Sequence, residues 1–442
     1  MAMSKRELAQ LVQLAQSLEA ASPADRQDLL DQLVAAGEAA IPHLVALLDS
    51  ADYRLRSSAA EALGEIAGPE AVPNLIELLA DSSVNAQRSA AEALSRMGGG
   101  AIDELLAALM SRDQGARRWA AEALGAIGDA TVAAELIQRL DDPNVEVQRA
   151  VATALGELKA ISAVDSLIGL LGAENVELAH DAAEALGKIR SPAAVKPLAE
   201  ALHNPSEEVR DAAQKALTQM GKRALKPLLQ KLGDPEARVR AQVAAILGEI
   251  GDERVLEGLG RALQDRDESV VCAAAISLGR VAGDQATPHL AKLVRHPRAS
   301  VRCAAAQGLA HARIDAAVAP LVELLKDRDW ATRMTAAKAL GEVGRPSAVR
   351  SLVHAVGDGE WCVRLHAVQS LAALGERSFA APALQRALAD PKETVRAAAA
   401  EALARLGVTE ALAAIRELTQ DASSVVAQAA AAALKRLQTP GA

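Results

Sequence analysis

The sequence predicts an all-α protein, a right-handed α-solenoid (superhelix) of about 13 two-helix repeats that follow a degenerate N-terminal capping unit. The main observation is a leucine that recurs at steps of 30 to 32 residues. Apolar residues with helical spacing surround each of these leucines, and no run of alternating apolar residues indicates a strand. We number the repeats 1 to 13 by their leucines, which are Leu63, Leu94, Leu124, Leu155, Leu186, Leu217, Leu247, Leu278, Leu309, Leu340, Leu371, Leu403 and Leu434.

The second half of each repeat contains the recurring leucine and predicts an amphipathic helix. Counted from that leucine as position 0, apolar residues fall at −8, −4, 0 and +3, as in Val239, Val243, Leu247 and Ile250. Glycine often follows at +1, although glycine costs about 1 kcal/mol relative to alanine inside a helix. We therefore expect close packing against a neighbouring helix at this position. These glycines are Gly64, Gly125, Gly156, Gly187, Gly248, Gly279 and Gly341.

The first half of each repeat predicts a second helix with its own apolar stripe, for example Val72, Leu75 and Leu79 in repeat 2. Proline often stands near the start of this helix, where the amides have no helical partner to lose. Short polar turns such as Asp234-Pro235-Glu236 separate the two helices of a repeat. The prolines are Pro42, Pro73, Pro197, Pro227, Pro288, Pro320 and Pro382.

Residues 1–40 depart from the repeat pattern and predict an N-terminal helical cap, so that the continuous repeat array covers residues 41–442. A first helix would place Leu8, Leu11, Val12, Ala15 and Leu18 on one face. Ser22-Pro23 then has the pattern of an N-cap followed by the first helical residue. A polar outer helix in this cap would seal the end of the apolar core.

The repeated pattern of leucine, aspartate, a short loop, Val-Arg, Ala-Ala-x-Ala-Leu-Gly and Ile-Gly resembles that of HEAT-repeat proteins. It is most similar to the short bacterial type named after phycobilisome lyases, over residues ~41–442. The resemblance implies an α-solenoid fold. It does not fix one function, because this group includes scaffolds, lyases, transport receptors and nucleic-acid enzymes.

The same resemblance implies a ladder of Asp–Arg pairs that ties the turns of adjacent repeats together. Arginine stands at position −7 in eight repeats, and in four of them an aspartate lies six residues earlier. In repeat 10 we expect Arg333 to pair with Asp327. The eight arginines are Arg56, Arg117, Arg210, Arg240, Arg302, Arg333, Arg364 and Arg396, and the four aspartates are Asp234, Asp327, Asp358 and Asp390.

Composition and charge narrow the function classes. Only 1% of residues are aromatic and the pI is about 5.5, which disfavours nucleic-acid binding. No stretch is long and apolar enough to predict a membrane span or a cleavable leader, and three cysteines make no disulfide framework, so we expect a cytoplasmic monomer. Net charge is −15 over residues 1–221 and +6 over residues 222–442, a polarity that could steer an oppositely polarised partner.

Helical geometry assigns positions −9, −6, −2 and +2 of the second helix to the exposed inner face. In the first repeats these positions are mostly charged. Arg88, Arg118 and Arg149 recur at −6, and Arg88 and Arg118 can each pair with a glutamate four residues on. We interpret these arginines as mutually neutralised rather than as a phosphate-binding row. In repeats 8 to 11 the same face becomes apolar, which predicts the partner-binding surface. Its residues are Trp330, Trp361, Met334, Leu365, Cys303, Cys272 and Ile276.

No catalytic constellation, cofactor motif or metal site is predicted. Cys362 and His366 are four residues apart on one helix, but no third group joins them. The chain also resembles deoxyhypusine hydroxylase in its helical repeats, yet none of its eight histidines is followed by glutamate, which that family's iron site needs. We therefore expect a non-enzymatic scaffold or adaptor that binds a segment of a protein partner along the concave face.

Two alternatives remain open. A phycobilin lyase, or a chaperone-like protein for antenna proteins, would present an open-chain tetrapyrrole in an apolar groove lined by tryptophan. A HEAT-type nucleic-acid enzyme, such as an alkylpurine glycosylase, is opposed by the acidic balance of the chain.

Overall fold

The computed structural model describes residues 13–14, 17–18 and 23–438. Within that part every regular element is an α-helix or a short 3₁₀ turn, and no strand occurs there. Every helix in the same part is too short or too polar to cross a lipid bilayer. The chain divides into two compact units, unit 1 (Met1–Ala224) and unit 2 (Leu225–Ala442).

Unit 1 contains the N-terminal helix α2 and six helix pairs that correspond to repeats 1 to 6. In each pair the first helix is short and the second is longer. The helices are α2 (Pro23–Ala35), α3 (Ile41–Leu47), α4 (Tyr53–Ile66), α5 (Val72–Leu78), α6 (Val84–Met97), α7 (Ile102–Ala108), α8 (Gln114–Ile127), α9 (Ala133–Ile137), α10 (Val145–Glu157), α11 (Val164–Leu170), α12 (Val176–Ile189), α13 (Val195–Ala201) and α14 (Glu207–Met220).

Unit 2 contains seven further pairs, repeats 7 to 13, when α18 is counted as two helices separated by a break at Gly283. Gly283 has φ 41° and ψ −106°, a conformation that side chains with a Cβ rarely adopt. The helices are α15 (Leu225–Lys231), α16 (Ala237–Ile250), α17 (Leu256–Ala262), α18 (Glu268–Leu293), α19 (Ala299–Ala312), α20 (Val318–Leu324), α21 (Trp330–Val343), α22 (Val349–Ala355), α23 (Trp361–Leu374), α24 (Arg377–Ala387), α25 (Glu393–Arg405), α26 (Leu412–Leu418) and α27 (Ser424–Gln438).

A 3₁₀ turn of three or four residues precedes most of the first helices. In repeats 1 and 2 the helix that follows has a proline at its second position, as the sequence predicted. The turns are η1 (Gly37–Ala40), η2 (Pro69–Ala71), η3 (Gly98–Ala101), η4 (Ala130–Val132), η5 (Ile161–Ala163), η6 (Pro192–Ala194), η7 (Gly221–Ala224), η8 (Glu253–Val255), η9 (Asp315–Ala317), η10 (Pro346–Ala348) and η11 (Thr409–Ala411).

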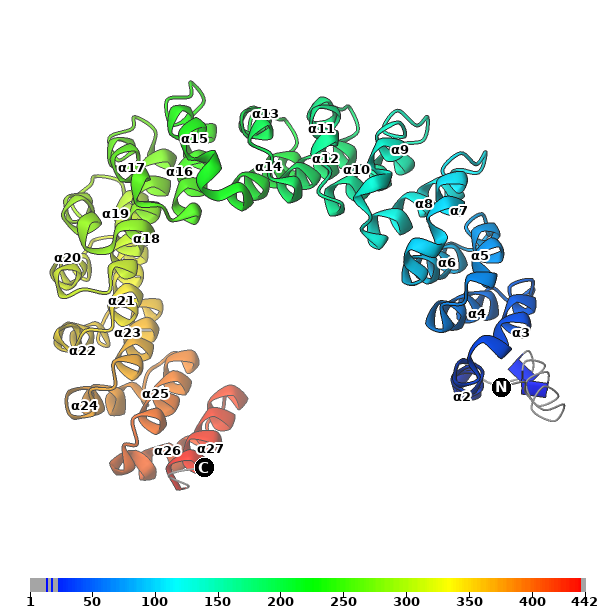
Figure 1. Cartoon of the computed structure of the whole chain (residues 1–442). Helices are drawn as coiled ribbons and strands as arrows, with labels where there is room; N and C mark the ends of the chain where they lie inside the picture. Colours follow the sequence, from blue (N-terminus) through cyan, green and yellow to red (C-terminus); the bar gives the residue numbers. More distant parts are fainter. Residues whose placement is uncertain (1–12, 15–16, 19–22, 439–442) are drawn as a thin grey trace. The chain divides into compact units, whose positions relative to one another are not determined.

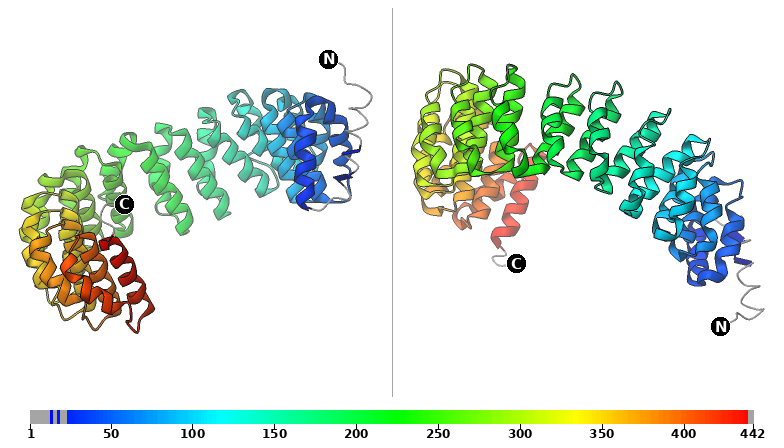
Figure 2. Two further views of the ribbon diagram at one scale, coloured as in Figure 1. Left: turned by 90° about the horizontal axis from the view of Figure 1, so that it is seen from below. Right: turned by 45° about the horizontal axis from the view of Figure 1, so that its top comes forward.

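Each unit has two layers, one made of first helices and the other of second helices (Figure 1). Successive pairs of one unit stack side by side in all views (Figures 1 and 2). The repeated leucines form the core between the layers, and twelve of the thirteen are 3% exposed or less. Leu434 is half-buried because it lies on α27, the last helix of the described part. The predicted α-solenoid of about 13 helix pairs is confirmed, and its right-handed superhelical turn stays a prediction.

The glycines at position +1 mark close contacts between successive second helices, as expected. A Cβ on Gly125 would lie 2.7 Å from the Cα of Ala154, and one on Gly187 would lie 2.9 Å from the Cα of Ala216. In unit 2, Gly279 faces Gly308 of the next second helix, and a Cβ there would collide with its backbone. These contacts involve backbone atoms that have no room to move, so only glycine fits.

The Asp–Arg ladder between adjacent repeats is confirmed, in seven bidentate pairs. The guanidinium Nε and Nη2 donate to both carboxylate oxygens of an aspartate 25 or 26 residues later, in the next repeat. Nη1 donates to backbone carbonyls of the arginine's own inter-helix loop. The pairs are Arg56–Asp81, Arg117–Asp142, Arg240–Asp265, Arg302–Asp327, Arg333–Asp358, Arg364–Asp390 and Arg396–Asp421.

The expected pairing of Arg333 with Asp327 was wrong. Arg333 donates to the carboxylate of Asp358 at 2.7 and 2.9 Å, and only the backbone carbonyl of Asp327 accepts from it, at 2.8 Å. The Asp327 carboxylate binds Arg302 of the preceding repeat instead. An aspartate six residues before an arginine therefore belongs to the previous rung, because the guanidinium points toward the next repeat.

The N-terminal region shows a further rung that the sequence analysis missed. Arg26 of α2 lies seven residues before Leu33 and pairs with Asp52 at 3.0 Å. Helix α2 begins at Pro23, as predicted, and Leu18 and Leu33 are fully buried. Of the predicted first helix, Leu8, Leu11, Val12 and Ala15 lie outside the described residues, as does Ser22. A helical cap over residues 1–40 and a continuous array over 41–442 stay predictions.

Candidate functional site

The second helices of unit 2 carry an unbroken apolar row at position −6. We call it the apolar row, and its members are Ala241, Cys272, Cys303, Met334, Leu365 and Ala397, one from each of repeats 7 to 12. The four central residues were predicted from the sequence, and the two alanines that extend them were not. The same position in unit 1 holds Ser57, Arg88, Arg118, Arg149, His180 and Asp211.

The large side chains of the apolar row are half-buried rather than fully exposed. Cys272, Cys303, Met334 and Leu365 all have intermediate exposure, as does Ile276 beside them. The Cys303 sulfur lies 3.5 Å from the hydroxyl of Thr332 on the next second helix. Each of these side chains thus leaves one side open to solvent, which suits a shallow contact surface.

Trp330 and Trp361 are the first residues of α21 and α23 and lie at position −10 of consecutive repeats. Their side chains are 46% and 40% exposed, so these rings are not core residues. Asp329 caps the first of the two helices by accepting from the Thr332 amide at 2.8 Å. The ammonium of Lys392 lies 5.4 Å from the ring centre of Trp361, within cation–π range.

The third tryptophan shows what a structural ring looks like in this protein. Trp119 of unit 1 is 6% exposed, and its indole N–H donates to the side chain of Gln87 at 2.8 Å. Within the described residues, no acceptor lies within hydrogen-bonding distance of the indole N–H of Trp330 or of Trp361. The two exposed rings of unit 2 therefore lack the intramolecular hydrogen bond of Trp119, and the ring of Trp361 also lies in cation–π range of Lys392.

The thiols of this surface are not arranged for nucleophilic chemistry. Burial raises the pKa of Cys272, and the nearby Glu268 adds to this increase, so the thiol stays protonated at neutral pH. His366 uses its Nδ1 on the backbone carbonyl of Cys362 at 2.9 Å rather than on the Cys362 sulfur. In the part of the chain that the structure describes, no group of three or more His, Cys, Asp or Glu side chains could hold a metal ion.

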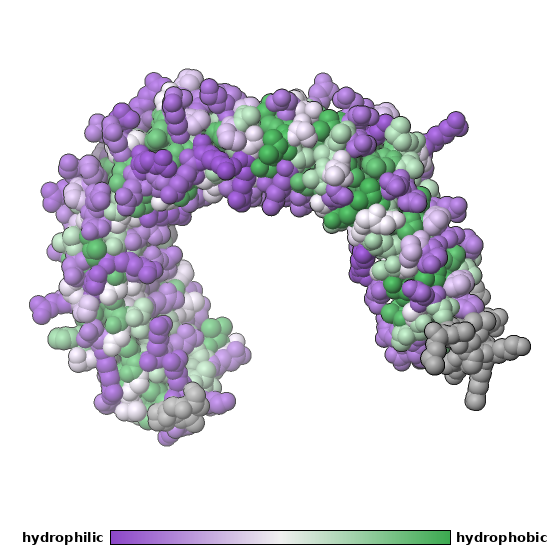
Figure 3. Space-filling view, viewed as in Figure 1, coloured by the Kyte–Doolittle hydropathy of each residue, from purple (hydrophilic) through white to green (hydrophobic). Residues whose placement is uncertain are grey.

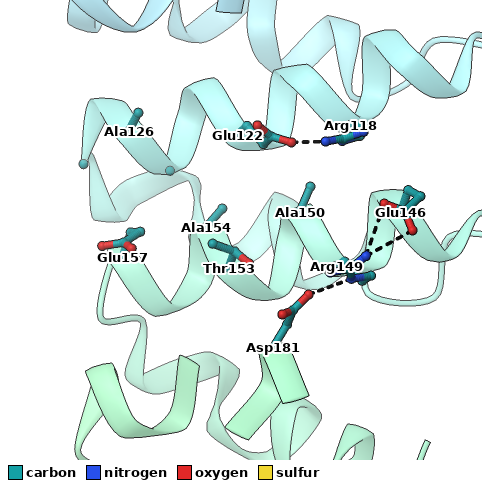
Figure 4. Close-up of a pocket in the computed structure, with 12 residues that line it drawn as sticks. Arg118, Glu122, Ala126, Glu146, Arg149, Ala150, Thr153, Ala154, Glu157 and Asp181 are labelled. Carbon is teal, nitrogen blue, oxygen red and sulfur yellow. Dashed lines mark hydrogen bonds and ion pairs between the residues drawn. The ribbon is translucent and has the colours of Figure 1, made fainter. Parts of the chain in front are cut away.

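Unit 1 has a different feature on its second helices, a polar groove of about 660 Å³ between α8, α10 and α12 (Figure 4). Arg118 pairs with Glu122 at 3.0 Å, and Arg149 pairs with Asp181 at 2.8 Å and with Glu146 at 3.3 Å. Burial alone would lower the pKa of Arg149, but these carboxylates outweigh it and raise the pKa. The interpretation of these arginines as neutralised is confirmed, although neither partner of Arg149, Glu146 or Asp181, was foreseen.

Hydrophilic and hydrophobic side chains are mixed over the visible face of each unit (Figure 3). The apolar row and the two tryptophans of unit 2 are therefore distinguished by their regular register, one position in every repeat, rather than by the amount of apolar surface. The exposed aromatic Tyr53 occupies the same −10 position in unit 1, at 39% exposure, but the side chain six residues before its leucine is a serine.

Comparisons with known proteins agree with this architecture. A family profile described as HEAT repeats matches residues 10–95, 75–141, 133–218, 225–302, 287–372 and 355–435. A search of curated protein sequences finds no significant match.

Several solved structures share the fold at low sequence identity. The Kap95:Nup1 complex contains a chain that is 15% identical, with a TM-score of 0.60 over 97% of this chain and 71% of that one. A structure of Kap95p bound to RanGDP gives 15% identity and a TM-score of 0.57 over the same shares of the two chains. A Kap121p mutant gives 13% identity and a TM-score of 0.57 over 94% of this chain and 58% of that one. At these identities the likeness shows the fold alone.

Proposed function

This chain belongs to the HEAT-repeat family, and we propose that it is a non-enzymatic scaffold that holds a segment of a protein partner against the second helices of unit 2. The observation that carries the proposal is the apolar row with Trp330 and Trp361 beside it, in one register over consecutive repeats. Met334, Leu365, Cys303, Cys272 and Ile276 complete the surface. We also propose that it is monomeric and that it acts in the cytoplasm, where thiols such as its three free cysteines stay reduced.

Physical reasoning supports binding as the role of these residues. The parts of these side chains that remain in contact with water contribute little to folding, so packing alone does not account for their exposed surface. Burying exposed tryptophan rings under a partner would release the ordered water around them, and such aromatic anchors dominate binding energies. A row of anchors at constant spacing favours a partner segment that runs along the repeats.

The solved neighbours support an interaction role in general terms. In these solved structures Kap95 is in complex with Nup1 and with RanGDP, so this architecture can bind other proteins. A solenoid offers one side chain per repeat at each register position, which suits the recognition of extended partner surfaces.

A second candidate is the binding of an open-chain tetrapyrrole, as in the phycobilisome-lyase type. The exposed indoles of Trp330 and Trp361 beside half-buried thiols would suit an apolar, conjugated ligand. Titration with biliverdin tests this candidate. A saturable change in bilin absorbance that Trp330→Ala with Trp361→Ala abolishes would support it, and unchanged absorbance would exclude it.

The scaffold proposal is tested by comparative affinity capture followed by mass spectrometry. The wild-type chain, the double variant Trp330→Ala with Trp361→Ala, and the matched control Tyr53→Ala are used as baits under identical conditions. We expect a protein that the wild type and the control retain and that the double variant loses, with unchanged helicity in all three. Partners that the double variant retains at wild-type levels would contradict the assigned surface.

A further inference from the structure

We infer that unit 2 contains a separate binding pocket between α17 and the part of α18 beyond Gly283, which takes a small organic molecule with a branched aliphatic group and no net charge. The pocket lies between two first helices, whereas the apolar row lies on second helices, so the two sites are independent. Its volume is about 360 Å³, within the range of about 300–1,000 Å³ that is typical of small-molecule sites.

The pocket exists because repeat 8 lacks a side chain that most other repeats have. Each first helix of repeats 1 to 13 has one fully buried leucine or isoleucine, and in eight repeats the next residue is a half-buried valine, isoleucine or leucine. In repeat 8 that next residue is Gly260, and a Cβ on it would have no atom of another helix within 4 Å. The eight residues are Val45, Ile76, Leu106, Ile137, Ile168, Leu229, Val322 and Val353.

Repeat 7 shows how the equivalent space is filled when the side chain is present. Leu229 of α15 packs against Gly258 of α17, so closely that a Cβ on Gly258 would lie 2.6 Å from the Leu229 Cδ2. One repeat later, Gly260 of α17 occupies the position of Leu229, and His289 of α18 occupies that of Gly258. The chain itself therefore fills this space between first helices with a branched aliphatic group, and in repeat 8 a ligand can supply that group.

The floor of the pocket is apolar because the connection between repeats 8 and 9 is irregular. In repeats 3, 7 and 10 a glycine with positive φ stands at position +4 and a 3₁₀ turn follows. In repeat 8 that position is Ala282, and α18 continues to its break at Gly283. The Thr287 hydroxyl donates to the Gly283 carbonyl at 3.2 Å and holds the break. The small Ala282 and Ala286 line the pocket, which reaches the core residue Leu278.

The mouth of the pocket is polar, and its charges balance. Glu257 and Arg261, a carboxylate and a guanidinium that line it, lie 3.7 Å apart and are both largely exposed. Gln264, Gln285 and His289 also line the pocket and are exposed. Amide and imidazole groups exchange hydrogen bonds with a hydroxyl or an amide. A ligand with a net charge would lose water without meeting an excess of opposite charge, so a neutral polar end fits best.

Saturation-transfer difference NMR on the full chain tests the pocket with 3-methylbutan-1-ol as the probe. We expect saturation of its methyl protons, with a Kd on the order of 1 mM for so small a ligand. Gly260→Leu supplies the missing side chain and should weaken the probe at least about tenfold. The matched control Gly169→Leu adds the same side chain to the first helix α11, where a Cβ also meets open space, and should change the affinity by less than about twofold.

Two further measurements locate the probe and define its chemistry. In the methyl-labelled wild type, the probe should shift the resonances of Leu256 and Leu278 and leave those of Leu321 on α20 unchanged. This measurement needs no variant, so it tests the pocket even where Gly260→Leu disturbs folding, which circular dichroism checks. The charged analogue 3-methylbutanoate should bind at least about fivefold more weakly than the alcohol.

The outcomes separate the pocket from the apolar row. Wild type that transfers no saturation, or a folded Gly260→Leu variant that binds as tightly as the wild type, would overturn the pocket. Equal binding of 3-methylbutanoate and the alcohol would overturn the preference for a ligand without net charge. Trp330→Ala with Trp361→Ala should leave the probe bound, and a loss there together with unshifted Leu256 and Leu278 methyls would place the probe on the apolar row instead.

Discussion

Units 1 and 2 share a scaffold and differ on the surface that their second helices expose. At positions −9, −6, −2 and +2, repeats 1 to 4 of unit 1 hold eleven charged residues among sixteen, whereas repeats 8 to 11 of unit 2 hold three, which are Arg280, Lys338 and Glu342. Both units have buried leucines, close glycine contacts and Asp–Arg rungs. Since the contacts that fold the two units are the same, the difference on the exposed surface is free to serve binding.

The largest effect on partner binding is expected when two residues of the apolar row are replaced by arginine, the residue that repeats 2 to 4 of unit 1 have at position −6. Met334→Arg with Leu365→Arg places two charges in the apolar row, where a bound segment would leave them without water or partner. We expect binding of the captured partner to weaken by about 3 kcal/mol, roughly 100-fold, with unchanged helicity. Isothermal titration calorimetry measures the affinity.

A matched control for this exchange lies in unit 1. Thr153→Arg adds the same side chain at the exposed position −2 of repeat 4, inside the polar groove. It should leave the affinity unchanged. Equal losses from Thr153→Arg and from the double exchange would show that both units bind the partner, and the contrast between them would then have no functional meaning.

The next largest effect is a loss of stability, expected when one of the Asp–Arg rungs that both units share is broken. Arg333→Ala in unit 2 removes both hydrogen bonds to Asp358, and Arg117→Ala in unit 1 does the same for Asp142. Each should cost about 1–3 kcal/mol of stability, because a largely buried carboxylate loses its partner. Partner affinity should stay within a few-fold. A thermal melt followed by circular dichroism measures the loss, and a variant that keeps its melting curve but no longer binds would make the ladder a binding feature.

Acid should weaken unit 2 more than unit 1. Hydrogen bonds from Arg240 lower the pKa of Asp265, and in Asp327 the Arg302 pair outweighs burial and also lowers the pKa. A depressed pKa in the folded state stabilises the fold above the unfolded value, about 3.9, and this stabilisation is lost as the pH falls through the folded value. Among the described residues, with each unit taken by itself, unit 2 has five bidentate rungs and unit 1 has two.

Hydrogen exchange measured by mass spectrometry resolves this difference on the intact chain. Between about pH 6 and about pH 3, after correction for intrinsic exchange rates, protection should fall further in the second helices of unit 2 than in those of unit 1. An equal loss in both units would show that the rungs do not govern acid stability. Arg302→Ala should lessen the acid sensitivity of unit 2, because one titrating pair is already broken.

The features that could be predicted from the sequence are those that depend on a single helix, namely its buried stripe and its close-contact glycine. The 3.6-residue period placed the stripe of Val239, Val243 and Leu247 in the core, and the cost of glycine inside a helix identified Gly125 as a contact point. The partner of Arg333 could not be assigned in this way. Asp327 and Asp358 occupy equivalent loops, and the choice between them depends on the direction of the guanidinium across the repeat interface.

The site was predicted in position but not in detail. Helical geometry put Trp330, Trp361 and Met334 on the exposed face of the second helices, yet Met334 is half-buried, which the periodicity of one helix does not describe. The groove of unit 1 was missed because it needs three successive helices and Asp181 from the third. Its signal in the sequence was the repeated arginine at position −6, which could have suggested an aligned polar channel.

The smallest effect is expected for an exposed ion pair of unit 1. Arg88 and Glu92 lie 3.9 Å apart on α6, and their side chains are 59% and 56% exposed. Water solvates both charges whether or not they pair, so Arg88→Ala should change the stability by only about 0.2–0.5 kcal/mol. The exchange also removes a residue at position −6, the register that forms the apolar row in unit 2. Calorimetric titration of the captured partner into Arg88→Ala should therefore give the wild-type affinity, and a loss of tenfold or more would assign binding to the charged surface of unit 1 as well.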